Sequence, residues 1–180
     1  VTSEDGSAIQ EYSITFQLST YVLIWGDEFE NDGSVYVSGQ NNPLDPVKWF
    51  HQTYPANGGV GWFNNEQQHY TDRLTNSYVS DGTLKIKAIK ETYVNPQTGS
   101  TQNYTSARIN SKFAFTYGRV DVRAKLPSEQ GTWPAIWTLG QNIIETGAYW
   151  QTQGYGSVGW PACGEIDIME QDTNKSLTSG

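Results

Sequence analysis

The chain has 180 residues, which is the size of one domain and enough to bury a hydrophobic core. Its formal net charge of −8 and its pI of about 4.6 disfavour nucleic acids and anionic membranes as partners. The one cysteine, Cys163, cannot form an internal disulfide, and no apolar run approaches the length of a membrane span. An aromatic content of 13% together with 18 glycines predicts an all-β chain with many turns.

The first predicted elements are two short strands near the amino terminus. Residues 1–20 include a short stretch in which apolar and polar residues alternate, which predicts an edge strand or the remnant of a linker from a preceding module. Residues 21–25 form an apolar run that leads into an acidic turn at residues 26–30. The main domain is therefore expected to occupy residues 21–180.

Residues 58–71 combine aromatic rings with side-chain amides, among them Trp62 and the pair Asn64 and Asn65. Amides can hydrogen-bond pairs of sugar hydroxyls, and flat aromatic rings stack on the face of a pyranose. A turn with a capping Asn at its start accounts for the same residues. The pattern alone therefore leaves a sugar site and an ordinary turn open.

Three alternating runs predict half-buried strands, at residues 84–90, 104–113 and 115–126. A turn at residues 81–82 precedes the first of them. The charged residues of the last run are expected to form a solvated face with ordinary cross-strand pairs. We assign no chemistry to these charges or to the lysines of the first run.

Trp133 and Trp137 lie four residues apart, so on a strand they share one face. Two Trp on one face more often belong to a core than to a site, but Ile136 and Leu139 can supply the core-facing side here.

The stretch that follows, residues 141–158, is too long and too rich in glycine for a tight turn. A long ordered loop usually shapes a binding site, although its aromatic residues could equally cover exposed core.

Three carboxylates alternate with apolar residues in residues 164–170, which predicts a strand with one acidic face. Glu165 and Asp167 share that face, whereas the odd offset of Glu170 needs one bulge near residues 168–169 to bring it back. Two Glu a few ångströms apart suit glycoside hydrolysis, in which one attacks the anomeric carbon and the other acts as acid and base. A solvated acidic face and a calcium site are the alternatives.

The string from Gly159 to Glu170 resembles the laminarinases, the endo-β-1,3-glucanases of glycoside hydrolase family 16, and carries that family's E-x-D-x-x-E signature. The resemblance implies a jelly-roll β-sandwich of two curved antiparallel sheets, with a substrate cleft on the concave face. It also implies retaining endo-hydrolysis by double displacement, with Glu165 as nucleophile and Glu170 as general acid/base. Asp167 is expected to hydrogen-bond the nucleophile, and Glu170 to be the carboxyl that holds a proton at working pH.

The same resemblance implies substrate contacts. In the family, the second Asn of a segment like the aromatic and amide segment above contacts glucose; this corresponds to Asn65, and Trp62 belongs to the same segment. The Ser-Ala-Arg-Ile context of Arg108 is also shared, and there the Arg reaches a sugar hydroxyl near the cleavage point. The Gly-x-Trp-Pro-Ala-Ile-Trp pattern places Trp133 and Trp137 around the subsite beside the nucleophile. A structural ion pair is the competing interpretation of Arg108.

No cofactor is needed for this chemistry, but the resemblance leaves room for a structural calcium ion. Two of its ligands would be Glu30 and the carbonyl oxygen of Gly82, while the usual Asp comes from a part of the family domain beyond the resemblance. The resemblance extends over residues 21–171, and several more strands normally follow the catalytic motif. We therefore expect a fragment, a sandwich completed by a second chain, or a sandwich closed in an unusual way.

The implied partner is a polysaccharide, β-1,3-glucan, with no nucleic acid and no membrane, and the implied location is extracellular. Two other functions stay open. The same fold could hydrolyse mixed-linkage glucan, agarose or carrageenan, although a sulfated substrate calls for a basic cleft and the net charge here is −8. A non-catalytic glucan-binding module or an inactive fragment is the other, although such modules usually lose one or both Glu, and Glu165 and Glu170 are both present.

Overall fold

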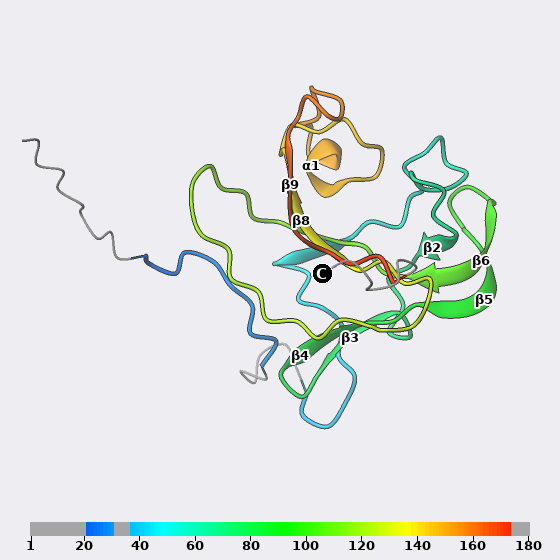
Figure 1. The fold of residues 1–180 in the computed structure, drawn as a ribbon, viewed down its shortest axis with the longest axis horizontal. Coiled ribbons are helices and arrows are strands. Elements are labelled where there is room, and N and C mark those ends of the chain that lie inside the picture. Colours follow the sequence, from blue (N-terminus) through cyan, green and yellow to red (C-terminus); the bar gives the residue numbers. More distant parts are fainter. Residues whose placement is uncertain (1–20, 31–36, 174–180) are drawn as a thin grey trace, which may run out of the picture.

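The computed structural model describes residues 21–30 and 37–173, which Figure 1 shows; the edge strand predicted in residues 1–20 lies outside them. The described residues form short β-strands and one helix of four residues, which confirms the predicted all-β class. Within these ranges no helix is long and apolar enough to cross a membrane. The elements are β1 (Trp49–His51), β2 (Gln68–Tyr70), β3 (Ser77–Ser80), β4 (Thr83–Ile86), β5 (Ile89–Val94), β6 (Thr101–Ser106), β7 (Ile109–Ser111), β8 (Ala135–Leu139), α1 (Tyr149–Thr152) and β9 (Glu165–Glu170).

The strands are grouped in small sheets of two or three strands (Figure 1). Antiparallel pairs form between β1 and β7, between β3 and β4, and between β8 and β9. In the three-stranded sheet, β6 lies between β5, which is antiparallel to it, and β2, which is parallel to it. This parallel pair departs from the predicted all-antiparallel arrangement, and the long connection between β2 and β6 makes it sterically accessible.

Two of the predicted strands, at residues 21–25 and 115–126, are wrong, because neither range contains a strand in the structure. Their apolar side chains other than Trp25 are exposed, and Leu23 keeps 82% of its surface accessible. The two segments run beside each other on the left of Figure 1, with the guanidinium of Arg119 5.9 Å from the centre of the Tyr21 ring. Alternation predicts a strand only where a second strand accepts its hydrogen bonds, and no strand of the described chain pairs with these segments.

The hydrophobic core is small and lies close to β1, β3, β4 and β7. Leu44 and Val79 are buried at its centre. The partly buried side chains that pack against them come from the segment before β1 and from β1, β4 and β7, so the core joins two of the small sheets. These side chains are Phe29, Trp49, Leu84 and Ile109.

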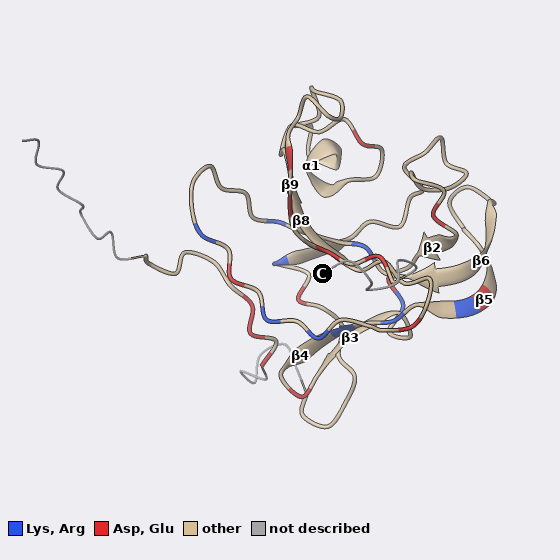
Figure 2. Ribbon diagram, viewed as in Figure 1, with Lys and Arg blue, Asp and Glu red and all other residues tan. Residues whose placement is uncertain are grey.

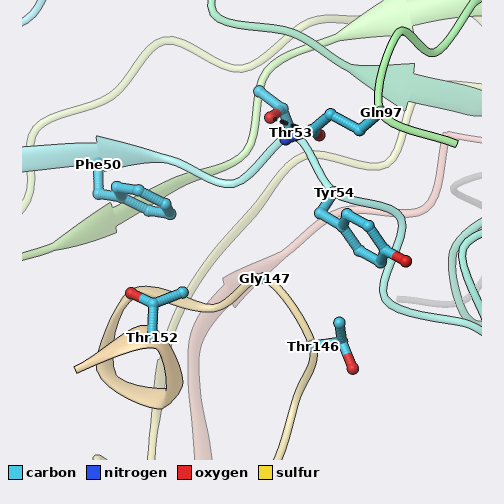
Figure 3. A pocket seen from close by; sticks show the side chains of 7 residues that line it. All are labelled: Phe50, Thr53, Tyr54, Gln97, Thr146, Gly147 and Thr152. Atoms are coloured by element: carbon cyan, nitrogen blue, oxygen red, sulfur yellow. Dashed lines mark hydrogen bonds between the residues drawn. The ribbon is translucent and has the colours of Figure 1, made fainter. Parts of the chain in front are cut away.

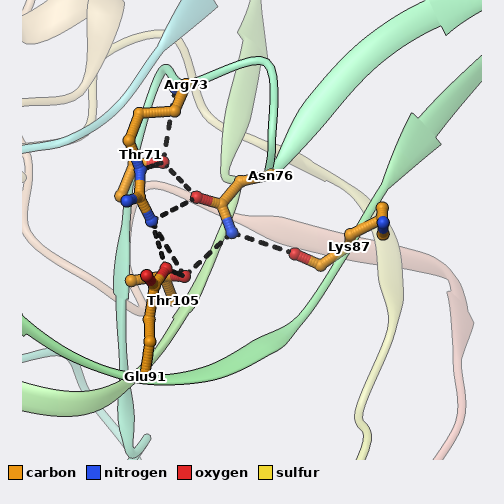
Figure 4. Close-up of polar contacts among 6 residues, drawn as sticks. All are labelled: Thr71, Arg73, Asn76, Lys87, Glu91 and Thr105. Atoms are coloured by element: carbon orange, nitrogen blue, oxygen red, sulfur yellow. Dashed lines mark hydrogen bonds and ion pairs between the residues drawn. The ribbon is translucent and has the colours of Figure 1, made fainter.

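A cluster of polar side chains, drawn in Figure 4, fastens the start of β3 to β5 and β6. The fully buried amide of Asn76 donates to the hydroxyl of Thr105 at 2.9 Å and accepts from Arg73 at 2.9 Å. Arg73 also forms an ion pair with Glu91. Because every buried member finds partners, the cluster offsets the desolvation of its polar groups and stabilises the fold. Thr71 and the backbone of Lys87 complete it.

Candidate active site

The three acids of the signature lie on β9, which pairs with β8 along its whole length. The register shifts by one residue between Ile136 and Trp137, so Ile168 has no partner on β8. This irregularity is the bulge that the odd spacing of Glu170 predicts, and it falls within the predicted residues. The paired residues are Leu139 with Glu165, Thr138 with Ile166, Trp137 with Asp167, Ile136 with Met169, and Ala135 with Glu170.

The other face of β9 is not covered as the alternation predicts. Ile166 and Ile168 were expected to face a core, yet Ile166 keeps 69% of its surface exposed and Ile168 is exposed as well. The prediction of a buried apolar face is therefore wrong for the described residues. A strand in a two-stranded sheet has one sheet neighbour, and here no described layer packs on its apolar side.

Each of the two Glu residues accepts a hydrogen bond from an indole N–H. Trp160 Nε1 donates to Glu165 Oε2 at 2.8 Å, and Trp133 Nε1 donates to Glu170 Oε1 at 3.2 Å. The sequence predicted Trp133 as a ring beside the substrate, and the structure leaves it exposed beside Glu170. Trp160 was missed, although it lies inside the string that carries the family resemblance. A hydrogen bond to one carboxylate oxygen restricts the orientation of the whole group, so these two rings orient the acids.

The pKa of Glu165 is raised above its ordinary value. The first cause is partial loss of hydration, and the charges of Asp167 and Glu170 and a hydrogen bond with Asp167 add to it. The hydrogen bond from Trp160 acts in the opposite direction, because it favours the charged form. That Glu170 holds a proton at working pH stays a prediction, and the raised pKa of Glu165 is a feature that the sequence did not predict. Both the loss of hydration and the hydrogen bond with Asp167 act directly on Glu165.

This shift makes stability depend on pH in a defined direction. A carboxyl with a raised pKa in the folded state contributes stability below its unfolded pKa and loses that contribution as pH rises through the folded pKa. Glu165→Gln removes the charge, so its unfolding temperature is expected to exceed that of the wild type at pH 7. The difference should shrink as the pH falls below about 4, where Glu165 is protonated in both states. Thermal unfolding from pH 3 to 8 measures it, and a gap that does not change with pH would contradict a raised pKa of Glu165 in the folded protein.

Arg108 is held in a partly buried polar cluster beside Trp137. Its Nη2 donates to Glu145 Oε1 at 2.7 Å, and the buried Gln52 donates to the same oxygen at 2.7 Å. The guanidinium also lies over two rings, 5.3 Å from the centre of Trp62 and 5.0 Å from that of Trp137. The structure thus contains the ion pair that the sequence left open as an alternative for Arg108. Its contact with a sugar stays a prediction.

Trp62 and Asn65, the other predicted contacts, occupy different environments. Trp62 is only 3% exposed and packs edge-on against Tyr70, with ring centres 4.5 Å apart. It supports Arg108 and offers no open ring face, so its sugar contact also stays a prediction. Asn65 is exposed in a turn in which it and Asn64 have positive φ, of 59° and 55°. Asn tolerates this conformation better than most residues, so the turn that the sequence allowed is present, with an exposed amide at its tip.

The two residues predicted as calcium ligands lie side by side. Gly82 has a φ of 65°, and a Cβ built on it would lie 3.8 Å from Cγ of Glu30. Calcium takes six to eight oxygen ligands, several of them usually carboxylates. Among residues 21–30 and 37–173, no three His, Cys, Asp or Glu side chains gather as a metal site would require. The described residues therefore supply part of a calcium site and do not complete one.

A surface hollow of about 260 Å³ lies beside the loop that carries α1 (Figure 3). None of the three acids lines it, and the sequence did not predict it. Aromatic and hydroxyl side chains face it from the segment after β1 and from the loop, as Figure 3 shows. Its lining residues are Phe50, Thr53, Tyr54, Gln97, Thr146, Gly147 and Thr152.

Comparison with known proteins decides the family. Residues 47–179 match the family model of the XgeA-like catalytic domain of glycoside hydrolase family 16. The chain belongs to glycoside hydrolase family 16. This confirms the family that the sequence resembles, while the predicted start of the domain at residue 21 stays a prediction.

Similar proteins of this family include enzymes with solved structures. The structure of the LamA catalytic domain from Zobellia galactanivorans is 59% identical, with a TM-score of 0.71, over 83% of this chain and 54% of that one. A LamA variant in complex with laminaritriose and laminaritetraose is 57% identical, with a TM-score of 0.74, over 85% and 56%. A beta-glucanase from Rhodothermus marinus is 42% identical over 82% of this chain and 43% of the relative. The chain thus spans about half the length of these relatives and has the jelly-roll fold class of family 16.

Proposed function

We propose that this chain carries the catalytic acids of a retaining endo-hydrolase of β-1,3-glucan. The observation that carries the proposal is the bulged strand β9, on which Glu165 and Glu170 each accept a hydrogen bond from an indole. Membership of glycoside hydrolase family 16 supports the reaction class. The LamA variant that binds laminaritriose and laminaritetraose supports the linkage, since it is 57% identical to this chain.

In the proposed reaction Glu165 attacks the anomeric carbon and forms a covalent glycosyl-enzyme intermediate. Glu170 protonates the leaving glycosidic oxygen in the same step and then removes a proton from the water that hydrolyses the intermediate. Asp167, whose carboxyl group interacts with that of Glu165, is proposed to fix the orientation of the nucleophile. Trp133 and Trp160 keep one oxygen of each Glu in place, so that the other oxygen is available to the substrate.

The charge distribution favours a neutral polymer over a sulfated one. Figure 2 shows acidic residues along β9 and no basic residue on that strand, while Lys and Arg are spread over other elements. A sulfated galactan needs cations near its sulfate groups. Mixed-linkage glucan is neutral as well, so it remains the second candidate substrate, and a glucan-binding module without activity is the second candidate class of protein.

The proposal is tested with purified protein, laminarin, lichenan and agarose. Release of reducing ends is expected to be fastest from laminarin, and proton NMR of the first products should show the β-anomer, because two displacements retain the configuration. Faster cleavage of lichenan would overturn the proposed linkage, and α-anomers would overturn the mechanism. Binding of laminarin oligosaccharides without any hydrolysis would identify a binding module instead.

Two further properties belong to this proposal. We propose that the protein acts outside the cell, because a glucan polymer is too large to enter one.

We also propose calcium as a structural ion at Glu30 and Gly82, which is supported by their adjacency and by the family resemblance. The chemistry itself needs no metal, since both steps use carboxyl groups and water.

A further inference from the structure

We propose that Glu145 is a positioning residue whose carboxylate anchors the loop of residues 141–158 to Arg108 and thereby holds Trp137 in place opposite Asp167. Nothing in the sequence pattern singles out Glu145. The anchoring rests on the contacts of the described residues alone, and its effect on catalysis rests on the function proposed above.

The first step is the environment of Glu145. Its side chain is 9% exposed, and the side chain of Arg108, its ionic partner, is 14% exposed. A carboxylate this far from water is stable only when it is paired and hydrogen-bonded. Arg108 and the buried Gln52 both donate to Oε1, each at 2.7 Å. Glu145 is therefore tied to two segments that are 37 and 93 residues away in the sequence.

The second step is the position of those two donors. Gln52 directly follows β1, and Arg108 directly precedes β7, the antiparallel partner of β1. The backbone N–H of Gln52 also donates to the carbonyl of Arg108 at 2.9 Å. Glu145 Oε1 thus accepts hydrogen bonds from both of two neighbouring chain segments, the end of β1 and the start of β7. Neutral Gln at position 145 would keep the size of the side chain and lose the charge that both donors face.

The third step leads from Arg108 to the acids. Its guanidinium lies 5.0 Å from the centre of the Trp137 ring, a distance typical of a cation–π contact. Trp137 pairs in register with Asp167, the middle acid of β9. The chain of contacts therefore runs from Glu145 through Arg108 and Trp137 to the strand that holds the acids. A change in the charge at Glu145 is expected to alter where the Trp137 ring rests.

The loop has other contacts with the body of the protein, which Glu145→Gln leaves in place: the Tyr149 ring centre lies 5.5 Å from that of Phe50 and 5.3 Å from Lys112 Nζ. Within it, Ile144 N donates to Val158 O at 2.8 Å, which closes the loop on itself. The N–H of Tyr149, the first residue of α1, donates to Asn110 Oδ1 at 3.0 Å, which is a second tie to β7. Glu145 is the one charged side chain in residues 141–158. Its ion pair with Arg108 is therefore the one ion pair, among the described residues, that anchors the loop.

The test compares Glu145→Gln with Glu91→Gln in otherwise unchanged protein. Glu91 is a matched control because, like Glu145, it forms an ion pair with an Arg and accepts a second hydrogen bond. Its second donor is the hydroxyl of Thr105, and it lies in the cluster of Figure 4. For Glu145→Gln we expect KM for laminarin oligosaccharides to rise about tenfold with kcat within about threefold, since ground-state and transition-state binding are lost alike. Hydrogen exchange in residues 141–158 should accelerate about fivefold or more. Glu91→Gln should lower the unfolding temperature and leave KM and this exchange within about twofold of wild type.

The outcomes separate this inference from the proposed function. If the wild type hydrolyses laminarin but Glu145→Gln changes neither KM nor exchange in the loop, the positioning role is overturned. If the wild type neither binds nor cleaves laminarin, the proposed function fails, and loop exchange alone decides whether Glu145 anchors the loop. Should Glu145→Gln not fold, Gln52→Leu removes one of the two donors and keeps the ion pair. It is expected to shift KM and exchange in the same direction by a smaller factor, and no shift would overturn the inference.

Discussion

Replacing Glu165 with Ser is expected to lower kcat on laminarin by about 10³-fold or more while leaving oligosaccharide binding nearly intact. The Ser hydroxyl is too short to reach the anomeric carbon from the same backbone position and is a poor nucleophile without an adjacent base. Binding should persist because the exposed ring of Trp133 and the bulged register of β9 do not depend on the Glu165 carboxylate. Initial rates of reducing-end release and calorimetric titration with laminaritetraose measure the two quantities.

A matched control and an added nucleophile sharpen this experiment. Asp121→Ser removes an exposed acid that pairs with Arg119, and it should leave kcat and binding unchanged. Azide added to Glu165→Ser can attack the anomeric carbon directly, and one displacement then gives a product of inverted configuration. In Glu170→Ser the covalent intermediate can still form from a substrate whose leaving group departs without protonation, such as a dinitrophenyl β-laminarioligoside, and with that substrate azide should give the retained configuration. Retained product from the Glu165 variant, or full turnover without azide, would show that Glu165 is not the nucleophile.

The sequence was most informative where function depends on residues close together in the chain. The alternation from Glu165 to Glu170 predicts a strand, and the odd offset within it predicts the bulge that the structure has at Ile168. Both follow from the two-residue period of a strand, which needs no knowledge of distant residues. The all-β class follows from composition alone, from the aromatic content and the 18 glycines.

The predictions that failed depend on partners far away in the chain. Residues 21–25 and 115–126 have the residue pattern of strands, but the structure has no strand there. A strand also needs a second strand as a hydrogen-bonding partner, and the alternation of residues does not show which segment that partner is. The ionic partner of Arg108 could not be predicted either, because Glu145 lies 37 residues away in the sequence and in a loop. The raised pKa of Glu165 was not predicted, because its first cause is loss of hydration, which residue spacing does not describe.

The second large effect is expected at Gly140, where the backbones at the end of β8 and before β9 approach each other closely. A Cβ built on Gly140 would lie 2.1 Å from the carbonyl oxygen and 2.9 Å from the carbonyl carbon of Cys163. Both are backbone atoms, so no side-chain rotation relieves the clash. Gly140 N also donates to Gly164 O at 3.0 Å, and this is the hydrogen bond between the two segments next to the pair of Leu139 and Glu165. Gly140→Ala must therefore push the two strands apart at this end.

We expect Gly140→Ala to lower the free energy of unfolding by about 3 kcal/mol, at the upper end of the range for overpacked sites. It should also lower kcat/KM on laminarin about 10- to 100-fold, since a displacement of about 1 Å in a catalytic group has an effect of this size. Gly159→Ala is the matched control, because a Cβ there meets no atom within 4 Å and its φ is not positive. Urea unfolding and initial rates for the two variants measure both effects. Equal stability of the two variants would mean that the backbones of β8 and of the segment before β9 are not in close contact at Gly140.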